Sequence, residues 1–138
     1  MSSYLITGAG RGLGLELVAQ LSRRADTSIV FAATRGTPSP ALQSLISSSH
    51  GKAVHVKMPI TDLGGIAQGV TEVEKKLQGR GLDVLINNAG TCPFSLKGIA
   101  AMDNLREGFE VNVEGVHNTT SALLPLLQKG KRKTVLNM

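Results

Sequence analysis

The sequence of 138 residues has one cysteine, one tyrosine, three phenylalanines and no tryptophan. The single cysteine, Cys92, excludes an intramolecular disulfide and is typical of a chain made in a reducing compartment. The net charge of +5 and the basic run Lys129–Lys133 are features that nucleic-acid-binding surfaces share. So few aromatic side chains, however, leave little for nucleic-acid bases to stack on. We therefore interpret the basic run as a solvated turn and expect no nucleic-acid partner.

Long apolar segments and targeting signals are absent as well. No apolar run approaches the roughly 20 residues that a membrane-spanning helix needs. The N-terminal segment MSSYLITGAG lacks both the basic region and the long apolar region of a secretory signal. The three histidines show no regular ligand spacing, so no metal site is predicted. We expect a cytoplasmic protein with no membrane partner.

Short apolar runs rich in β-branched residues alternate with helical patterns along the whole chain. The runs predict strands at residues 4–6, 28–32, 53–56, 83–86 and 134–136. The spacing of apolar residues predicts helices at residues 13–24, around 40–46, at 66–77 and at 102–128. Pro125 is expected to bend the last helix. This alternation predicts a single α/β domain, residues 1–138, with a parallel sheet covered by helices on both faces.

A glycine-rich segment, Thr7-Gly8-Ala9-Gly10-Arg11-Gly12-Leu13-Gly14, follows the first apolar run. Glycines between a strand and a helix permit a sharp turn, and they let a pyrophosphate approach the backbone N–H groups of the helix. The spacing differs from the G-x-G-x-x-G of many dinucleotide-binding domains. Taken alone, the segment is also typical of a tight surface turn.

The segment resembles the TGxxxGxG fingerprint of the short-chain dehydrogenase/reductase family, and four later features match that family in order. They are Asp62 after the third expected strand, Asn87-Asn88-Ala89-Gly90 at the end of the fourth, Asn112 in the last helix, and the apolar segment 134–138. The resemblance covers the whole chain and implies a Rossmann-type sheet, truncated after the fifth strand, that forms the cofactor-binding half of the family. The sequence also resembles fungal ketoreductases of secondary metabolism.

The resemblance implies a nucleotide cofactor and the residues that bind it. In the family the Asp at position 62 hydrogen-bonds near the adenine, the NNAG segment lines the cofactor cleft, and the Asn at position 112 holds a water in the catalytic proton relay. The predicted cofactor-binding residues are Gly8, Arg11, Gly12, Leu13, Gly14, Arg35, Asp62, Asn88, Ala89 and Gly90.

The choice between NAD and NADP is indicated by charge. NAD-preferring domains usually carry an acidic residue about 20 residues beyond the glycines, which accepts a hydrogen bond from the ribose 2′-hydroxyl. Here the second expected strand ends in Ala33-Thr34-Arg35, without an acid. Arg35 offers a planar cation for a 2′-phosphate, and Arg11 lies inside the glycine-rich segment. Either arginine alone is also typical of a solvated surface, but together they favour NADP (NADPH).

The chemistry that the resemblance implies is hydride transfer between NADP(H) and a carbonyl or alcohol substrate. In the family a Tyr is the acid/base, a Lys four residues later lowers the pKa of that Tyr, and a Ser orients the substrate. All three follow the fifth strand, whereas the one tyrosine of this chain, Tyr4, lies in the first. Two hypotheses remain: an oxidoreductase cut short, lacking the Ser, Tyr and Lys, or a non-catalytic nucleotide-binding protein or regulatory partner of a full-length relative.

A sheet that ends at the fifth strand is expected to leave apolar surface uncovered. The segment Leu123–Leu127 and the fifth strand are the expected positions of that surface. Exposed apolar patches are typical of protein–protein interfaces, so the expected partners include further copies of this chain, in a homo-oligomer.

Overall fold

Five parallel strands form one sheet in the computed structural model, which describes residues 1–138. The strands are β1 (Ser2–Thr7), β2 (Thr27–Thr34), β3 (Ala53–Lys57), β4 (Val84–Asn87) and β5 (Thr134–Asn137). Their order in the sheet is β3-β2-β1-β4-β5. The predicted α/β class and parallel sheet are therefore confirmed, with strand ends that differ from the predicted ones by two residues at most.

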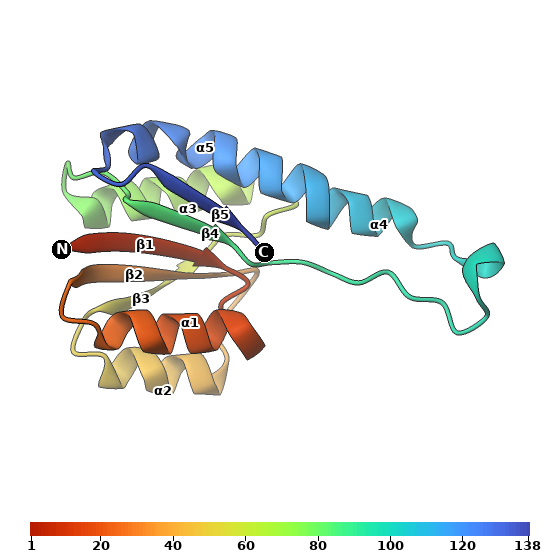
Figure 1. Cartoon of the computed structure of the whole chain (residues 1–138), viewed down its shortest axis with the longest axis horizontal. Coiled ribbons are helices and arrows are strands. Elements are labelled where there is room, and N and C mark those ends of the chain that lie inside the picture. The colour runs from red at the N-terminus through yellow and green to blue at the C-terminus, as the bar shows by residue number, and fades with distance from the viewer.

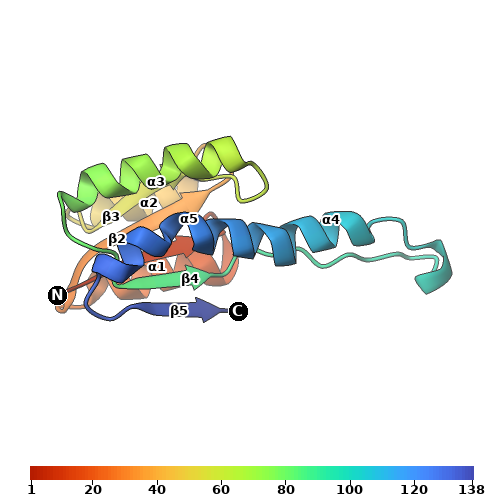
Figure 2. The same ribbon diagram turned by 90° about the horizontal axis from the view of Figure 1, so that it is seen from above.

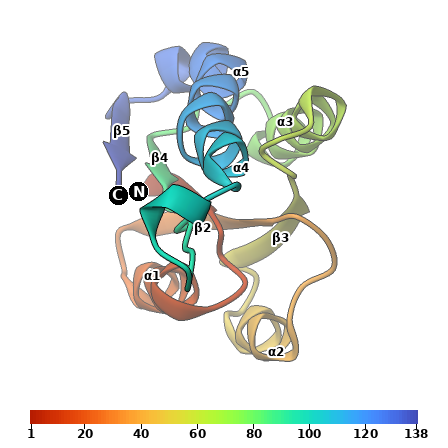
Figure 3. The same ribbon diagram turned by 90° about the vertical axis from the view of Figure 1, so that its right-hand side faces the viewer.

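Helices cover both faces of the sheet, as predicted (Figures 1 and 3). The two that cover one face are α1 (Gly12–Arg23) and α2 (Pro40–Ser48), and the two that cover the other are α3 (Leu63–Leu77) and α5 (Val116–Lys129). Each interface has its own buried core, with Val18, Val30 and Leu42 on the first face and Phe31 and Leu123 on the second. None of the helices combines the length and apolar character needed to cross a membrane.

The predicted single helix over residues 102–128 is wrong in detail. The structure has a short 3-10 turn, η1 (Ile99–Ala101), then α4 (Leu105–Phe109), a π-helical segment, η2 (Glu110–Gly115), and finally α5. Pro125 lies inside α5. Apolar periodicity does not distinguish a π-helical turn from an α-helical one, because the two differ in which backbone groups pair and not in which residues are apolar.

Residues 91–104 form an arm that extends away from the sheet before the chain returns along α4 (Figures 1 and 2). Three of its apolar side chains, Phe94, Leu96 and Ile99, are exposed. The exposure predicted for Leu123–Leu127 is mostly wrong, because its other three leucines pack in the core and only Leu124 and Pro125 are exposed. In β5, by contrast, Val135 and Leu136 are exposed as expected.

The sheet has a switch point beside its central strand. From β1 the chain proceeds to β2 on one side, and β4 lies on the other side of β1. Parallel α/β folds bind ligands at such a point, in the crevice outside the carboxyl ends of the strands. The loops that follow β1, β2 and β4 meet at this edge, which is also the edge from which the arm emerges (Figure 1).

Candidate functional site

The glycine-rich loop between β1 and α1 adopts a conformation that favours glycine at three positions. Gly12 has a φ of 56° and Gly8 a φ of 66°, in the left-handed region that residues other than glycine rarely adopt. Gly8 also lies against Ala89. Gly14, in the first turn of α1, packs so closely that a Cβ atom there would overlap the Gly8 carbonyl oxygen and the Asn88 side chain. The start of α1 can therefore approach the end of β1 only because Gly8 and Gly14 lack a side chain.

The loop that follows β4 holds the glycine-rich loop in place. Asn88 Nδ2 donates to the carbonyl oxygens of Thr7 (3.0 Å) and Gly8 (3.2 Å). In return, the Thr7 hydroxyl accepts from the backbone N–H groups of Asn88 (3.1 Å) and Ala89 (3.0 Å). The structure thus brings the predicted residues Gly8, Gly14, Asn88 and Ala89 into direct contact. The Thr7 hydroxyl was not predicted, although its position directly before Gly8 at a strand end was a usable signal.

The end of β2 forms the other side of this edge. Arg35 follows β2, and both Arg35 and Arg11 are exposed and take part in neither of the two ion pairs of the chain. Ser39, which caps α2 by accepting from Leu42 N (3.2 Å), donates its hydroxyl to the Gly10 carbonyl oxygen (2.7 Å). This bond, which the sequence did not predict, ties the β2–α2 loop to the glycine-rich loop. The arginines at positions 11 and 35 thus belong to two loops that are joined.

Asp62 and Asn112 each make a local contact. Asp62 is the N-cap of α3 and accepts from Gly64 N through Oδ1 (3.1 Å). Asn112, in the π-helical segment η2, pairs with the backbone of Thr91, accepting from its N–H (2.8 Å) and donating to its carbonyl oxygen (2.7 Å). The Asn112 side chain therefore fixes the base of the arm, next to Gly90. Leu13 and Gly12 are exposed at the start of α1.

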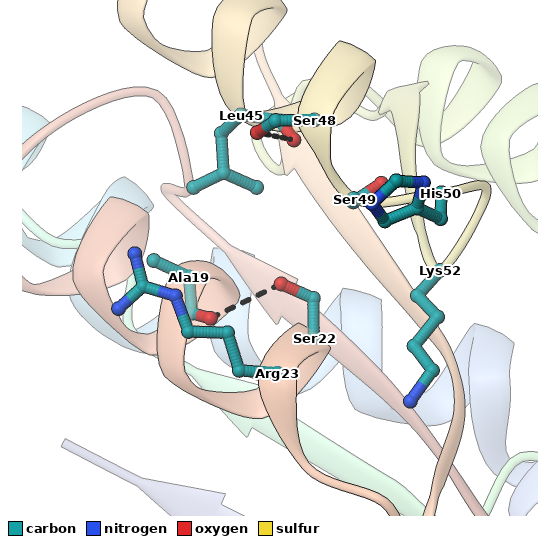
Figure 4. A pocket seen from close by; sticks show the side chains of 8 residues that line it. All are labelled: Ala19, Ser22, Arg23, Leu45, Ser48, Ser49, His50 and Lys52. Carbon is teal, nitrogen blue, oxygen red and sulfur yellow. Dashed lines mark hydrogen bonds between the residues drawn. The ribbon is translucent and has the colours of Figure 1, made fainter.

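Of two cavities, the first lies away from these loops, and the second is lined by residues of η2 and of the β3–α3 loop, the segments that carry Asn112 and Asp62. The first, of about 310 Å³, lies between the last turns of α1 and α2 at the amino edge of the sheet, and its lining includes Arg23, His50 and Lys52 (Figure 4). The basic groups of Arg23 and Lys52 point in different directions, and Lys52 Nζ donates to the Arg24 carbonyl oxygen (2.7 Å). The other cavity, about 300 Å³, is polar and is lined by Thr61, Glu110, Glu114 and Asn118. No group of three His, Cys, Asp or Glu residues is placed to hold a metal ion.

Comparison with known proteins identifies relatives along nearly the whole chain. The short chain dehydrogenase family model matches residues 3–138. The short-chain dehydrogenase/reductase AacuF of Aspergillus aculeatus is 35% identical, over 100% of this chain and 54% of that protein. Estradiol 17-beta-dehydrogenase 2 of Rattus norvegicus is 32% identical, over 96% of this chain and 35% of that protein. Fungal relatives are thus present, as the sequence suggested.

Solved structures agree with this assignment. An NADPH-bound carbonyl reductase from chicken fatty liver superposes with a TM-score of 0.82 at 32% identity, over 94% of this chain and 52% of that one. The carbonyl reductase Sniffer of D. melanogaster superposes with a TM-score of 0.81 at 29% identity, over 94% and 53%. The chain spans about half the length of AacuF and of both reductases. With the family model matching residues 3–138, the chain belongs to the short-chain dehydrogenase/reductase family.

Proposed function

We propose that the chain binds NADP(H) at the carboxyl edge of the sheet, as the cofactor-binding half of an NADP-dependent oxidoreductase. The observation that carries this proposal is the glycine-rich loop, in which two positions exclude a side chain and Asn88 and Thr7 fix the backbone. A related carbonyl reductase has been solved with NADPH bound. The cofactor supplies a hydride when it is bound.

The loop fits the phosphates of a dinucleotide. The first N–H groups of α1 have no partner within a helix, and the positive end of the helix dipole lies at the same place. No acidic residue stands in the first turn of α1 to oppose a negative ligand. Because Gly8 and Gly14 lack side chains, α1 begins close to the end of β1. Its first N–H groups therefore lie at the carboxyl edge of the sheet, where they favour a ligand that carries a pyrophosphate.

The charges around the loop favour the 2′-phosphate of NADP over the free hydroxyl of NAD. Arg35 follows β2 and Arg11 precedes α1, and neither guanidinium is neutralised by an acid within the chain. The turn after β2 contains no carboxylate that would accept from a ribose hydroxyl or repel a phosphate. An arginine suits this task because its planar group pairs with two phosphate oxygens at once.

Arg35→Asp is expected to remove or reverse a preference for NADPH over NADH. The substitution replaces a cation that attracts the 2′-phosphate by an anion that repels it and accepts from the 2′-hydroxyl. Isothermal titration calorimetry with both cofactors measures the change, which we expect to be at least about tenfold in the affinity ratio. Arg23→Asp makes the same change of charge at the opposite edge of the sheet and should leave the ratio within about twofold. Equal affinity of the unmodified chain for both cofactors would count against the assignment to NADP.

A polypeptide of residues 1–138 is expected to show no NADPH-dependent reduction of carbonyl compounds. The one tyrosine, Tyr4, is 5% exposed, and its hydroxyl accepts from Arg132 Nη1 (3.2 Å) on the loop that precedes β5, at the amino edge. It is therefore not available as an acid/base at the carboxyl edge. Loss of absorbance at 340 nm with a panel of ketones measures the rate. A rate of NADPH oxidation clearly above the rate in buffer alone would show that another residue of the chain acts as the acid/base.

The alternative proposal is a non-catalytic nucleotide-binding protein or a regulatory partner of a full-length relative. The observation that bears on it is the burial of Tyr4, which leaves residues 1–138 without an accessible tyrosine. Sequencing independent transcripts beyond the codon for residue 138 separates the two proposals. A downstream Ser and a Tyr-x-x-x-Lys motif would support the oxidoreductase, whereas a stop codon shared by all transcripts would support the non-catalytic protein.

A further inference from the structure

A chain of hydrogen bonds runs from β3 to the turn that carries Arg35. The ring Nε2 of His55, in β3, lies 2.8 Å from the hydroxyl oxygen of Thr34, the last residue of β2. The Thr34 hydroxyl in turn lies 2.8 Å from the Gly36 carbonyl oxygen and donates to it. All three residues are half-buried. His55, which was not predicted as a site residue, is thus linked through one hydroxyl to the residue that follows Arg35.

The direction of each bond follows from the donors available. A hydroxyl has one proton, and here that proton goes to the Gly36 carbonyl oxygen, which can only accept. The Thr34 oxygen must therefore accept from His55, so the Nε2 atom of the imidazole carries a proton. The chain runs in one direction, from the His55 N–H through the Thr34 hydroxyl to the Gly36 carbonyl.

This chain of bonds fixes the orientation of the peptide between Gly36 and Thr37. The peptide is trans, so its N–H points opposite to its C=O. Because the C=O is directed at Thr34, the Thr37 N–H points away from β2. The N–H groups of Gly36 and Thr37 have no hydrogen-bond partner within the chain. Unpaired backbone N–H groups are donors from which an anion can accept, and the exposed Arg35 precedes them directly in the sequence.

We propose that His55 is a positioning residue for the recognition of the cofactor's 2′-phosphate, acting through Thr34 on the turn of residues 35–37. This inference rests on the proposed binding of NADP(H). It adds a residue that contributes to the preference for the 2′-phosphate of NADP over the 2′-hydroxyl of NAD. His55 does not touch the cofactor. It holds the Thr34 hydroxyl so that the turn presents its backbone N–H groups and Arg35 together. A loosened turn would weaken binding of a 2′-phosphate and leave binding of a 2′-hydroxyl nearly unchanged.

The test measures the affinities for NADPH and for NADH by calorimetry, on the full chain and on variants at positions 34 and 55. His55→Phe is expected to weaken NADPH binding by roughly three- to tenfold, as for the loss of one hydrogen bond, with NADH binding within about twofold. His55→Gln, whose amide N–H reaches a similar point, should restore the NADPH affinity. Thr34→Val, a nearly isosteric change, should reproduce the effect of His55→Phe, and the double variant should add nothing further. His117→Phe, an exposed histidine on α5, is the matched control.

The outcomes separate this inference from the proposed function. If the unmodified chain prefers NADPH and folded variants at positions 34 and 55 keep that preference, losing only thermal stability, the bonds merely support the sheet edge and the inference is overturned. If the unmodified chain shows no preference for NADPH, the assignment to NADP fails and the inference fails with it. Should His55→Phe not fold, as judged by circular dichroism, the same criteria apply to Thr34→Val.

Discussion

Gly14→Ala is expected to abolish cofactor binding and to lower the free energy of unfolding by at least about 2 kcal/mol. The added methyl group would overlap the Gly8 carbonyl oxygen, which belongs to backbone, and the Asn88 amide, which two hydrogen bonds hold in place. Neither neighbour can rotate away, so relief requires α1 to move from the end of β1. That movement would also displace the N–H groups proposed to hold the pyrophosphate.

Urea denaturation followed by circular dichroism measures the loss of stability, and titration with NADPH measures the loss of binding. Gly10→Ala is the matched control for stability, because a Cβ atom there would meet only the Thr34 methyl group, at an ordinary 3.6 Å, and the residue has no positive φ. If both variants had the same denaturation midpoint, the close contact at Gly14 would not be the cause of the predicted loss of stability.

Asp83→Ala is expected to lower the free energy of unfolding by about 3 kcal/mol or more, since it leaves several partly buried donors unpaired. One carboxylate oxygen accepts from the backbone N–H of Ser3 (2.9 Å) and from its hydroxyl (3.1 Å). The other accepts from the backbone N–H groups of Lys131 (2.7 Å) and Arg132 (3.3 Å). A single side chain thus joins the start of β1 to the loop that leads into β5. Asp83→Asn should lower the free energy of unfolding by less than Asp83→Ala, because the amide oxygen of asparagine can still accept hydrogen bonds from one of the two groups of donors.

The same site predicts a dependence of stability on pH. Burial by itself would raise the pKa of Asp83, but the hydrogen bonds from Ser3, Lys131 and Arg132 outweigh it and hold the pKa below its ordinary value. A lowered pKa in the folded state stabilises the fold above the ordinary pKa of about 3.9, and this stabilisation is lost as the pH falls below it. Denaturation midpoints measured from pH 7 to pH 3 should therefore fall, and less steeply in Asp83→Asn.

Asp26 provides the comparison for this measurement. Its hydrogen bond with Arg24 also lowers the pKa of the Asp26 carboxyl group, but both side chains are more than half exposed. Exposed pairs of this kind contribute little and are screened by salt. Asp26→Asn should therefore leave the stability at pH 7, and the fall in denaturation midpoint between pH 7 and pH 3, almost unchanged. If Asp26→Asn reduced that fall and Asp83→Asn did not, the result would contradict the role assigned to Asp83.

The parts of this molecule that depend on local sequence were predictable. The strands follow from short runs such as Ser28–Ala32, and the glycine-rich loop follows from its position between an apolar run and a helical pattern. The bonds of Asp83, Asn88 and His55 were not, because each joins residues that lie far apart in the sequence. The prediction that Leu123–Leu127 is exposed was mostly wrong for a similar reason. The packing of α5 against the sheet decides which of its leucines are buried.

The bonds between Thr7 and Asn88 can form only late in the synthesis of this chain, because the two residues lie far apart in the sequence. The segment 7–14 leaves the ribosome early, yet the side chain that holds it in shape is translated 81 residues after Thr7. At about 5–20 residues per second, this delay amounts to several seconds. During that time the nascent chain has a β1 that lacks β4 beside it and a loop without its clamp, and non-local pairing of this kind is slow. The glycine-rich loop therefore comes first in the sequence, and its hydrogen bonds are complete only once β4 and the loop after it have been made.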